Sequence, residues 1–288
     1  MPTPQPPVAV VTGASRGAGR GIAIALGSHG CKVYVTGRSE KTGDAILPGT
    51  IYETAEAVTA AGGEGVAVRV DHADDAQVRA LFDRVEREDG RLDILVNNAF
   101  YQNEAMNARG PFWEKPLELV NCLDVGLRSS YVASHMAAPL LCRSERGLVA
   151  FTSATGAVHY AFGPAYGVQK AGTDKMAADM AVDFRKAGVA CVSIWMGAVA
   201  TERLRMMMDE NPDYEKAVSQ IMETPEFTGH VIWGIFEDPE RMTLSGQTVI
   251  GAEMALQYGI QDEGGRQPPS FRDLHKVEPM KQYPVTFR

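Results

Sequence analysis

The chain has 288 residues, of which 45% are hydrophobic and 22% charged, and its formal net charge is -8. Such a length and composition are typical of a globular protein that buries a sizeable core. The net negative charge argues against general binding to nucleic acid or to an anionic membrane surface, although a small anionic ligand can still bind at local basic residues.

The cysteines and the N-terminus narrow the class further. Cys31, Cys122, Cys142 and Cys191 are widely spaced inside apolar stretches, with no CxxC pair and no Cys/His cluster. We therefore expect core thiols in a reducing compartment and no metal site. Residues 1–7 are proline-rich and lack the layout of a signal peptide, and no run of 18 apolar residues predicts a membrane span. A cytoplasmic protein is the expectation.

Short apolar runs alternate along the chain with segments of helical periodicity. The runs that predict strands are 8–12, 32–36, 65–70, 92–96, 148–152, 190–195 and 248–250. Helices are predicted from the turn after residue 12 to Gly30, and over 52–61, 76–88, 116–142, 166–187, 201–222 and 226–237. Residues 40–51 and 100–114 have loop composition.

This alternation, without a break in composition, predicts one α/β domain. We expect a single-domain Rossmann-type fold over residues 8–262, with a doubly wound parallel sheet and helices on both faces. Residues 1–7 are expected to form a flexible N-terminus. Residues 263–288, polar and rich in Pro and Gly, are expected to form an irregular C-terminal tail.

A glycine-rich turn separates the first strand from the first helix. It reads Thr12-Gly-Ala-Ser-Arg-Gly-Ala-Gly19. Glycines in this context permit a tight turn and a close approach of the backbone to a pyrophosphate at the helix N-terminus. The candidate cofactor-binding residues of the turn are Gly13, Ser15, Arg16, Gly17, Ala18 and Gly19.

The end of the second strand indicates which dinucleotide binds. NAD-binding folds usually offer an acid to the ribose 2′-OH there, but this chain has Gly37-Arg38-Ser39 and no acid until Glu40. Arg38 and Arg16 are suited to a 2′-phosphate, so NADP(H) is predicted in preference to NAD(H). Asp71 follows the third strand and is either an adenine-binding residue or a helix N-cap.

Tyr166 and Lys170 are four residues apart in a predicted helix, and so share one face of it. A nearby ammonium favours the charged form of a phenol, whose pKa is ordinarily about 10. Such a pair suits proton transfer near neutral pH. An isolated pair of this kind is more often part of a solvated helix, so its meaning depends on the motifs around it.

The motifs in chain order resemble the short-chain dehydrogenase/reductase superfamily. They are the glycine turn, Asn97-Asn-Ala99, Ser153, Tyr166-x-x-x-Lys170 and Met196-Gly-x-Val-x-Thr201, and they cover about residues 8–252. Three shorter stretches, Phe112-Trp-Glu-x-Pro116, Val125-Gly-Leu-Arg128 and Leu244-Ser-Gly246, resemble its dehydrogenase/reductase member 1 branch.

The resemblance implies roles for these residues. Tyr166 is the expected general acid/base, Lys170 lowers its pKa and binds the nicotinamide ribose, and Ser153 positions the substrate oxygen. Asn98, Ala99, Gly197, Val199 and Thr201 are the expected cofactor contacts beyond the glycine turn. A phenol and a hydroxyl aimed at a carbonyl oxygen stabilise its developing charge and supply the proton.

Some positions depart from the superfamily pattern. Gly126 stands 27 residues before Ser153, where relatives commonly have an asparagine that holds a water in a proton relay. Phe100 replaces the usual glycine after Ala99, and Met196 replaces the proline before Gly197. The relay is therefore in question, whereas the Ser–Tyr–Lys set is complete.

The predicted function is an NADP(H)-dependent oxidoreductase that interconverts a hydrophobic ketone or aldehyde and its alcohol. The alternative is a catalytically weak NADP(H)-binding sensor, which Gly126 and Phe100 favour. Segments 100–114 and 202–228 are expected to shape the substrate pocket, as are His159, Tyr160 and Phe162. The methionines of 202–228 suit an adaptable apolar pocket but are equally ordinary core or interface residues. The resemblance implies a homodimer or homotetramer formed through the helices 116–142 and 166–187.

Overall fold

The structure is a computed structural model that describes residues 5–283 and 285–286. Its centre is a seven-stranded sheet of order β3-β2-β1-β4-β5-β6-β9, in which every pairing is parallel. The strands are β1 (Val8–Val11), β2 (Lys32–Gly37), β3 (Glu64–Arg69), β4 (Ile94–Asn97), β5 (Leu148–Ser153), β6 (Ala190–Trp195) and β9 (Thr248–Ile250). The predicted fold class is confirmed.

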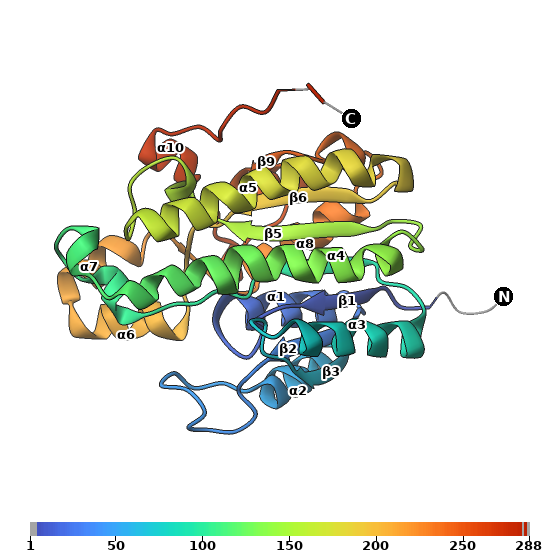
Figure 1. The fold of residues 1–288 in the computed structure, drawn as a ribbon. Helices are drawn as coiled ribbons and strands as arrows, with labels where there is room; N and C mark the ends of the chain where they lie inside the picture. The colour runs from blue at the N-terminus through green and yellow to red at the C-terminus, as the bar shows by residue number, and fades with distance from the viewer. Residues whose placement is uncertain (1–4, 284, 287–288) are drawn as a thin grey trace.

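Helices cover both faces of this sheet (Figure 1). In β1, Val8 and Val10 pack into one core, and Ala9 and Val11 into the other. The first core is completed by α3 (Asp75–Asp89), α4 (Ser129–Leu141) and α5 (Pro164–Phe184). The second is completed by α1 (Gly17–Ser28), α2 (Ile51–Ala60), α8 (Phe227–Glu237) and α9 (Gly251–Tyr258). Burial on both faces explains why the interior strands are mostly apolar.

Capping residues set the ends of α2 and α3. Thr50 and Glu53 form a reciprocal capping box at the start of α2. The Asp74 carboxylate accepts from two backbone N–H groups at the start of α3, and Gly90 ends that helix with a φ of 72°. Asp74, and not Asp71, is therefore the N-cap of α3.

The long helix predicted over 116–142 is wrong in its first half. Residues Leu117–Val120 form a 3₁₀ turn, and Leu123–Arg128 form a widened turn that is interrupted at Val125 and Gly126. Gly126 has a φ of 146°, a backbone conformation that residues other than glycine rarely adopt. The regular helix α4 therefore begins only at Ser129, whose hydroxyl accepts a hydrogen bond from Gly126 N at 3.0 Å.

The helix predicted over 201–222 is also interrupted. It consists of α6 (Glu202–Glu210) and α7 (Pro212–Val218), because Pro212 cannot continue the hydrogen bonding of the first helix. After α7 the chain forms β8 (Met222–Glu223), which pairs with β7 (Ala198–Val199) in a small parallel sheet.

The segment after Asp262, expected to be irregular, contains, besides the 3₁₀ turn Glu263–Gly265, a short α-helix, α10 (Phe271–His275). Ser270 caps it by accepting a hydrogen bond from Asp273 N at 3.4 Å. Five residues are too few to give a periodic signal in the sequence. The preceding helix α9 was not predicted either.

The four cysteines differ in their exposure. Cys31, Cys122 and Cys191 are buried thiols as expected, but Cys142 is exposed at the end of α4. No helix in the described part of the chain is both long and apolar enough to cross a bilayer. Among the same residues, no three His, Cys, Asp or Glu side chains are grouped so as to hold a metal ion.

Candidate active site

The predicted site residues converge at the carboxyl ends of β1, β4, β5 and β6. These strands are neighbours in a parallel sheet, so their carboxyl ends share one edge. The chain order reverses between β1 and β4, and ligands of doubly wound sheets bind at such a point. The glycine turn follows β1, Asn98 follows β4, Ser153 ends β5 and Gly197 follows β6.

The glycine turn is packed so closely that side chains are excluded from two of its positions. A Cβ on Gly13 would lie 2.7 Å from the Cα of Ala99, and one on Gly19 would lie 2.3 Å from the carbonyl oxygen of Gly13. Asn98 Nδ2 donates to the carbonyl oxygens of Thr12 and Gly13 at 2.9 and 3.1 Å. Asn98 thus fastens the turn to the end of β4.

The N-terminus of α1 already binds a carboxylate. The backbone N–H of Gly17 donates to Glu202 Oε2 at 2.9 Å, and Glu202 is the first residue of α6. A helix N-terminus that takes an anionic oxygen in this way fits a cofactor phosphate. The residues of the turn are therefore suited to a dinucleotide.

The two arginines predicted to bind a 2′-phosphate differ in their contacts. Arg16 donates through Nε to the carbonyl oxygen of Pro48 at 3.0 Å, and through Nη2 to Ser39 Oγ and the carbonyl oxygen of Gly49 at 2.8 Å each. Most of its donors are thus used to fasten the loop after β2. Arg38 has a side chain that is 68% exposed, with Nη1 3.7 Å from Asp71 Oδ2. Arg38 is the more available of the two.

Glu40, the first acid after β2, is engaged elsewhere. Its Oε2 lies 3.1 Å from Arg69 Nε, and its Oε1 accepts from the hydroxyl of Tyr52 at 3.1 Å. These contacts occupy both carboxylate oxygens with partners outside the glycine turn.

Tyr166 and Lys170 lie on adjacent turns of α5. Lys170 is 7% exposed, and its Nζ donates to the carbonyl oxygen of Thr152 at 3.3 Å and lies 5.7 Å from the centre of the Tyr166 ring. Burial lowers the pKa of Lys170 to about 8, against the opposing effect of the Asp174 carboxylate. Burial raises the pKa of Tyr166 to about 12. Burial is the cause of this shift, and the lowering of the phenol pKa by Lys170 that the resemblance implied does not appear in this structure.

Ser153 is fully buried at the end of β5. Its single hydroxyl proton is shared between the carbonyl oxygen of Lys170, at 3.5 Å, and the carboxylate of Asp174. Asp174 accepts from Ser193 Oγ at 2.6 Å and from Trp195 Nε1 at 2.9 Å. None of the hydrogen bonds among the described residues joins Ser153 to Tyr166, so the hydroxyl is directed at the Lys170 backbone and at Asp174 and not at the phenol.

Gly126 does not leave an open space. A Cβ there would lie 3.2 Å from both Gln169 Cγ and Phe100 Cδ2. Gln169 is 2% exposed, and its Nε2 donates to Thr173 Oγ1 at 3.1 Å. The widened turn at Gly126 is thus filled by the Gln169 and Phe100 side chains.

The loop after β6 is held by Glu223, a residue that was not predicted from the sequence. Gly197 N donates to Glu223 Oε2 at 3.1 Å, and Thr228 Oγ1 donates to Oε1 at 3.1 Å. Glu223 is 1% exposed, and burial raises its pKa to about 7. Val199 pairs with Glu223 between β7 and β8, while Thr201 caps α6. Glu223 was missed because it lies just beyond a segment predicted as helix.

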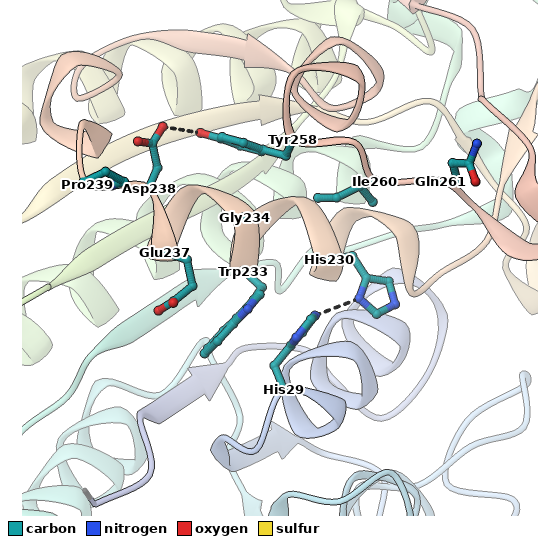
Figure 2. A pocket seen from close by; sticks show the side chains of 10 residues that line it. All are labelled: His29, His230, Trp233, Gly234, Glu237, Asp238, Pro239, Tyr258, Ile260 and Gln261. Carbon is teal, nitrogen blue, oxygen red and sulfur yellow. Dashed lines mark hydrogen bonds between the residues drawn. The ribbon is translucent and has the colours of Figure 1, made fainter.

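A separate cavity of about 640 Å³ lies away from these residues, at the carboxyl end of α1 (Figure 2). His29 Nε2 lies 3.0 Å from His230 Nδ1 there, and Trp233 stacks on His29 with the ring centres 4.8 Å apart. None of the predicted catalytic or cofactor-binding residues lines this cavity. The candidate active site is therefore assigned to the carboxyl ends of the strands and not to this cavity.

The fold and the strand-end residues define a dinucleotide-binding α/β protein of the Rossmann type, in which a tyrosine–lysine pair lies beside the glycine turn. A family model described as short chain dehydrogenase matches residues 7–213. The chain belongs to the short-chain dehydrogenase/reductase family.

Its relatives include dehydrogenase/reductase SDR family member 1. The human protein of that name is 38% identical over 281 residues, which cover 94% of this chain and 87% of that one. The mouse protein is 37% identical, with coverage of 93% and 86%. These similarities place the chain in the member 1 branch.

A solved structure agrees on the fold. A short chain dehydrogenase from Mycobacterium thermoresistibile superimposes with a TM-score of 0.75 at 24% identity, covering 92% of each chain. Family membership supports a dehydrogenase or reductase activity on a small molecule with a nicotinamide cofactor.

Proposed function

We propose that the protein is an NADP(H)-dependent oxidoreductase that interconverts a hydrophobic ketone or aldehyde and its alcohol, with Tyr166 as general acid/base. The observation that carries this proposal is the position of Tyr166 and Lys170. Both lie on α5 at the sheet edge that holds the glycine turn, with Lys170 Nζ 5.7 Å from the centre of the Tyr166 ring. When bound, the cofactor supplies or accepts the hydride.

The protonation states suit carbonyl reduction. A phenol with a pKa of about 12 is protonated at neutral pH, and this is the form that donates a proton to a carbonyl oxygen. A lysine with a pKa of about 8 is still mostly charged at pH 7. Its ammonium stabilises the negative charge that develops on the phenol oxygen as the proton leaves. Oxidation of an alcohol requires the phenolate and is therefore favoured at higher pH.

The residues around the second strand support NADP(H) over NAD(H). Arg38 is largely exposed at the end of β2, and a guanidinium is well suited to a phosphate. Both oxygens of Glu40 are held by Arg69 and Tyr52, which leaves them poorly placed to accept from a ribose hydroxyl. In this proposal Arg38 contacts the 2′-phosphate and Asp71 lies beside the adenine.

The surroundings of the phenol favour an apolar substrate. Phe100 and Phe162 meet the ring of Tyr166 edge-on, with ring centres 5.9 and 5.1 Å away. Phe162 is 49% exposed and has a φ of 56°, so the chain holds an aromatic ring outward beside the reacting group. Of the methionines in segment 202–228, Met208 is buried and serves as a core residue. Met206 is 44% exposed and is available to an apolar substrate.

We also propose a cytoplasmic homodimer or homotetramer that associates through the α4 and α5 helices. Tyr131 on α4 and Val168 on α5 are 55% and 54% exposed, as an unpaired helical face would be. Sedimentation at several protein concentrations measures the state directly.

The function is tested with a panel of hydrophobic ketones, aldehydes and alcohols, each assayed with both cofactors. Turnover that is faster with NADPH than with NADH at equal concentration is the expected result. Cofactor binding without turnover of any member would instead support the NADP(H) sensor. The filled space at Gly126 and the inward hydroxyl of Ser153 are the features that favour that second reading.

A further inference from the structure

The short helix α10 packs against the sheet edge that holds the site. Phe271 Cε2 lies 3.3 Å from the position that a Cβ on Gly197 would occupy. His275 Nδ1 lies 2.9 Å from Thr155 Oγ1, and Thr155 follows Ser153 by two residues. The next residue, Gly156, lies directly against the Tyr166 ring, since its Cβ would be 2.5 Å from Cε1. Figure 1 shows α10 beside the end of α5 where that helix begins.

Hydrogen bonds determine which nitrogen of His275 carries the proton when both imidazoles are neutral. His159 Nδ1 lies 3.3 Å from the carbonyl oxygen of Tyr160, which can only accept, so Nδ1 is the donor. His159 Nε2 is then an acceptor and takes the hydroxyl proton of Thr155 at 3.0 Å. The Thr155 oxygen accepts in turn from His275 Nδ1. Nε2 of His275 is therefore left with a lone pair.

The ring that carries this lone pair is held in place, and the lone pair is accessible from outside the protein. The His275 ring is fixed edge-on by Phe271 and His159, whose ring centres lie 5.2 and 5.0 Å away. His275 remains exposed, and no hydrogen bond of its Nε2 is found among the described residues. A fixed acceptor among aromatic rings, close to the reacting phenol, selects a ligand that brings a donor to it.

We propose that His275 Nε2 accepts a hydrogen bond from a hydroxyl group on the substrate, so that the preferred class is a hydrophobic ketone or aldehyde with a hydroxyl remote from its carbonyl. The inference rests on the proposed function, because it places the carbonyl at Tyr166. The apolar body of the substrate lies along Phe162 and Phe271, and its far end reaches α10. His275 is then a residue that determines specificity.

The test compares two ketones that differ only in the distal group, 2-decalone and a decalone with a hydroxyl on the second ring, each with NADPH. The unaltered protein is expected to prefer the hydroxyl compound in kcat/KM. His275→Phe keeps an aromatic ring beside Phe271 but removes the acceptor. In this variant the ratio of kcat/KM for the hydroxyl compound to kcat/KM for 2-decalone should fall about fivefold, through KM. A change of this size is the effect of one hydrogen bond between neutral groups. His29→Phe, at the carboxyl end of α1, and Leu274→Ala, an exposed change on α10 itself, should leave it unaltered.

A second measurement does not depend on turnover. With NADP⁺ bound, the hydroxydecalone is titrated into protein labelled with ¹⁵N in its histidines. The Nε2 signal of His275 is expected to shift, and that of His29 is not.

The outcomes separate the two proposals. Turnover with equal preference in the unaltered protein and in His275→Phe overturns the inference and leaves the proposed function standing. No turnover but a shifted His275 signal contradicts the catalytic function and supports the binding role. Neither turnover nor a shift overturns both.

Discussion

Glu202 Oε2 accepts a hydrogen bond from the backbone N–H of Gly17 at 2.9 Å, so a side chain of α6 lies at the anion-binding end of α1. The Gly17 N–H is a donor that a cofactor phosphate is expected to take. A carboxylate and a phosphate cannot share it. We therefore expect Glu202 to compete with the cofactor, and binding of the cofactor to separate the start of α6 from the glycine turn.

Replacement of Glu202 should consequently tighten cofactor binding. Glu202→Gln removes the competing charge, and we expect the Kd for NADPH to fall about fivefold, equivalent to roughly 1 kcal/mol for a partly exposed hydrogen bond to a charged group. Glu210→Gln, at the exposed far end of α6, is the matched control. Fluorescence titration measures both. An unchanged or weaker affinity in Glu202→Gln would show that the carboxylate does not compete.

Arg38 should account for the preference between cofactors. Arg38→Ala is expected to weaken NADPH binding about tenfold and to leave NADH binding unaltered, because only NADPH carries the 2′-phosphate. Lys41→Ala removes an exposed positive charge three residues later. It controls for the long-range electrostatic effect of losing one positive charge. Equal losses for the two cofactors in Arg38→Ala would contradict the assignment.

Lys170 should determine how reduction depends on pH. Its pKa of about 8 means that the ammonium is charged below that pH and loses its proton above it. The single-turnover rate of carbonyl reduction should therefore fall as the pH rises through about 8, whereas alcohol oxidation, which needs the deprotonated phenol, should rise with pH. Stopped-flow measurement at saturating cofactor tests this. A reduction rate that stays constant from pH 6 to about 10 would rule out a role for the lysine charge.

Asp174 should be important for stability. Its buried carboxylate accepts from Ser193 Oγ and Trp195 Nε1, and both donors lie in the interior strand β6. Asp174→Ala leaves them without a partner, and we expect a loss of about 2–4 kcal/mol in the free energy of unfolding. Asp179→Ala, on the exposed side of α5, should change it by less than about 0.5 kcal/mol. Denaturant unfolding compares the two, and equal losses would refute the buried role.

The fold was predictable because its signals are local and repeated. Each interior strand is a mostly apolar run, and the glycine turn stands where β1 meets α1, so the parallel sheet and its functional edge follow from the sequence. The errors lie where one residue overrides a periodic pattern. Gly126 interrupts the helix predicted over 116–142, and Pro212 divides the one predicted over 201–222.

The remaining contacts of the site join residues far apart in the sequence. Glu202 reaches Gly17 across 185 positions, and His275 reaches Thr155 across 120. Neither residue belongs to a motif, and their partners are determined only when the chain folds. The direction of the Ser153 hydroxyl likewise depends on Lys170 and Asp174 in the neighbouring helix.

The central claim is that Tyr166 transfers the proton in a hydride-transfer reaction. Tyr166→Phe removes one oxygen and retains the ring that Phe100 and Phe162 contact. The most direct measurement compares NADPH affinity and single-turnover ketone reduction in this variant with those of the unaltered protein. We predict an unchanged Kd for NADPH and a rate reduced at least about 100-fold, the usual contribution of a general acid. Reduction at the unaltered rate would contradict the account.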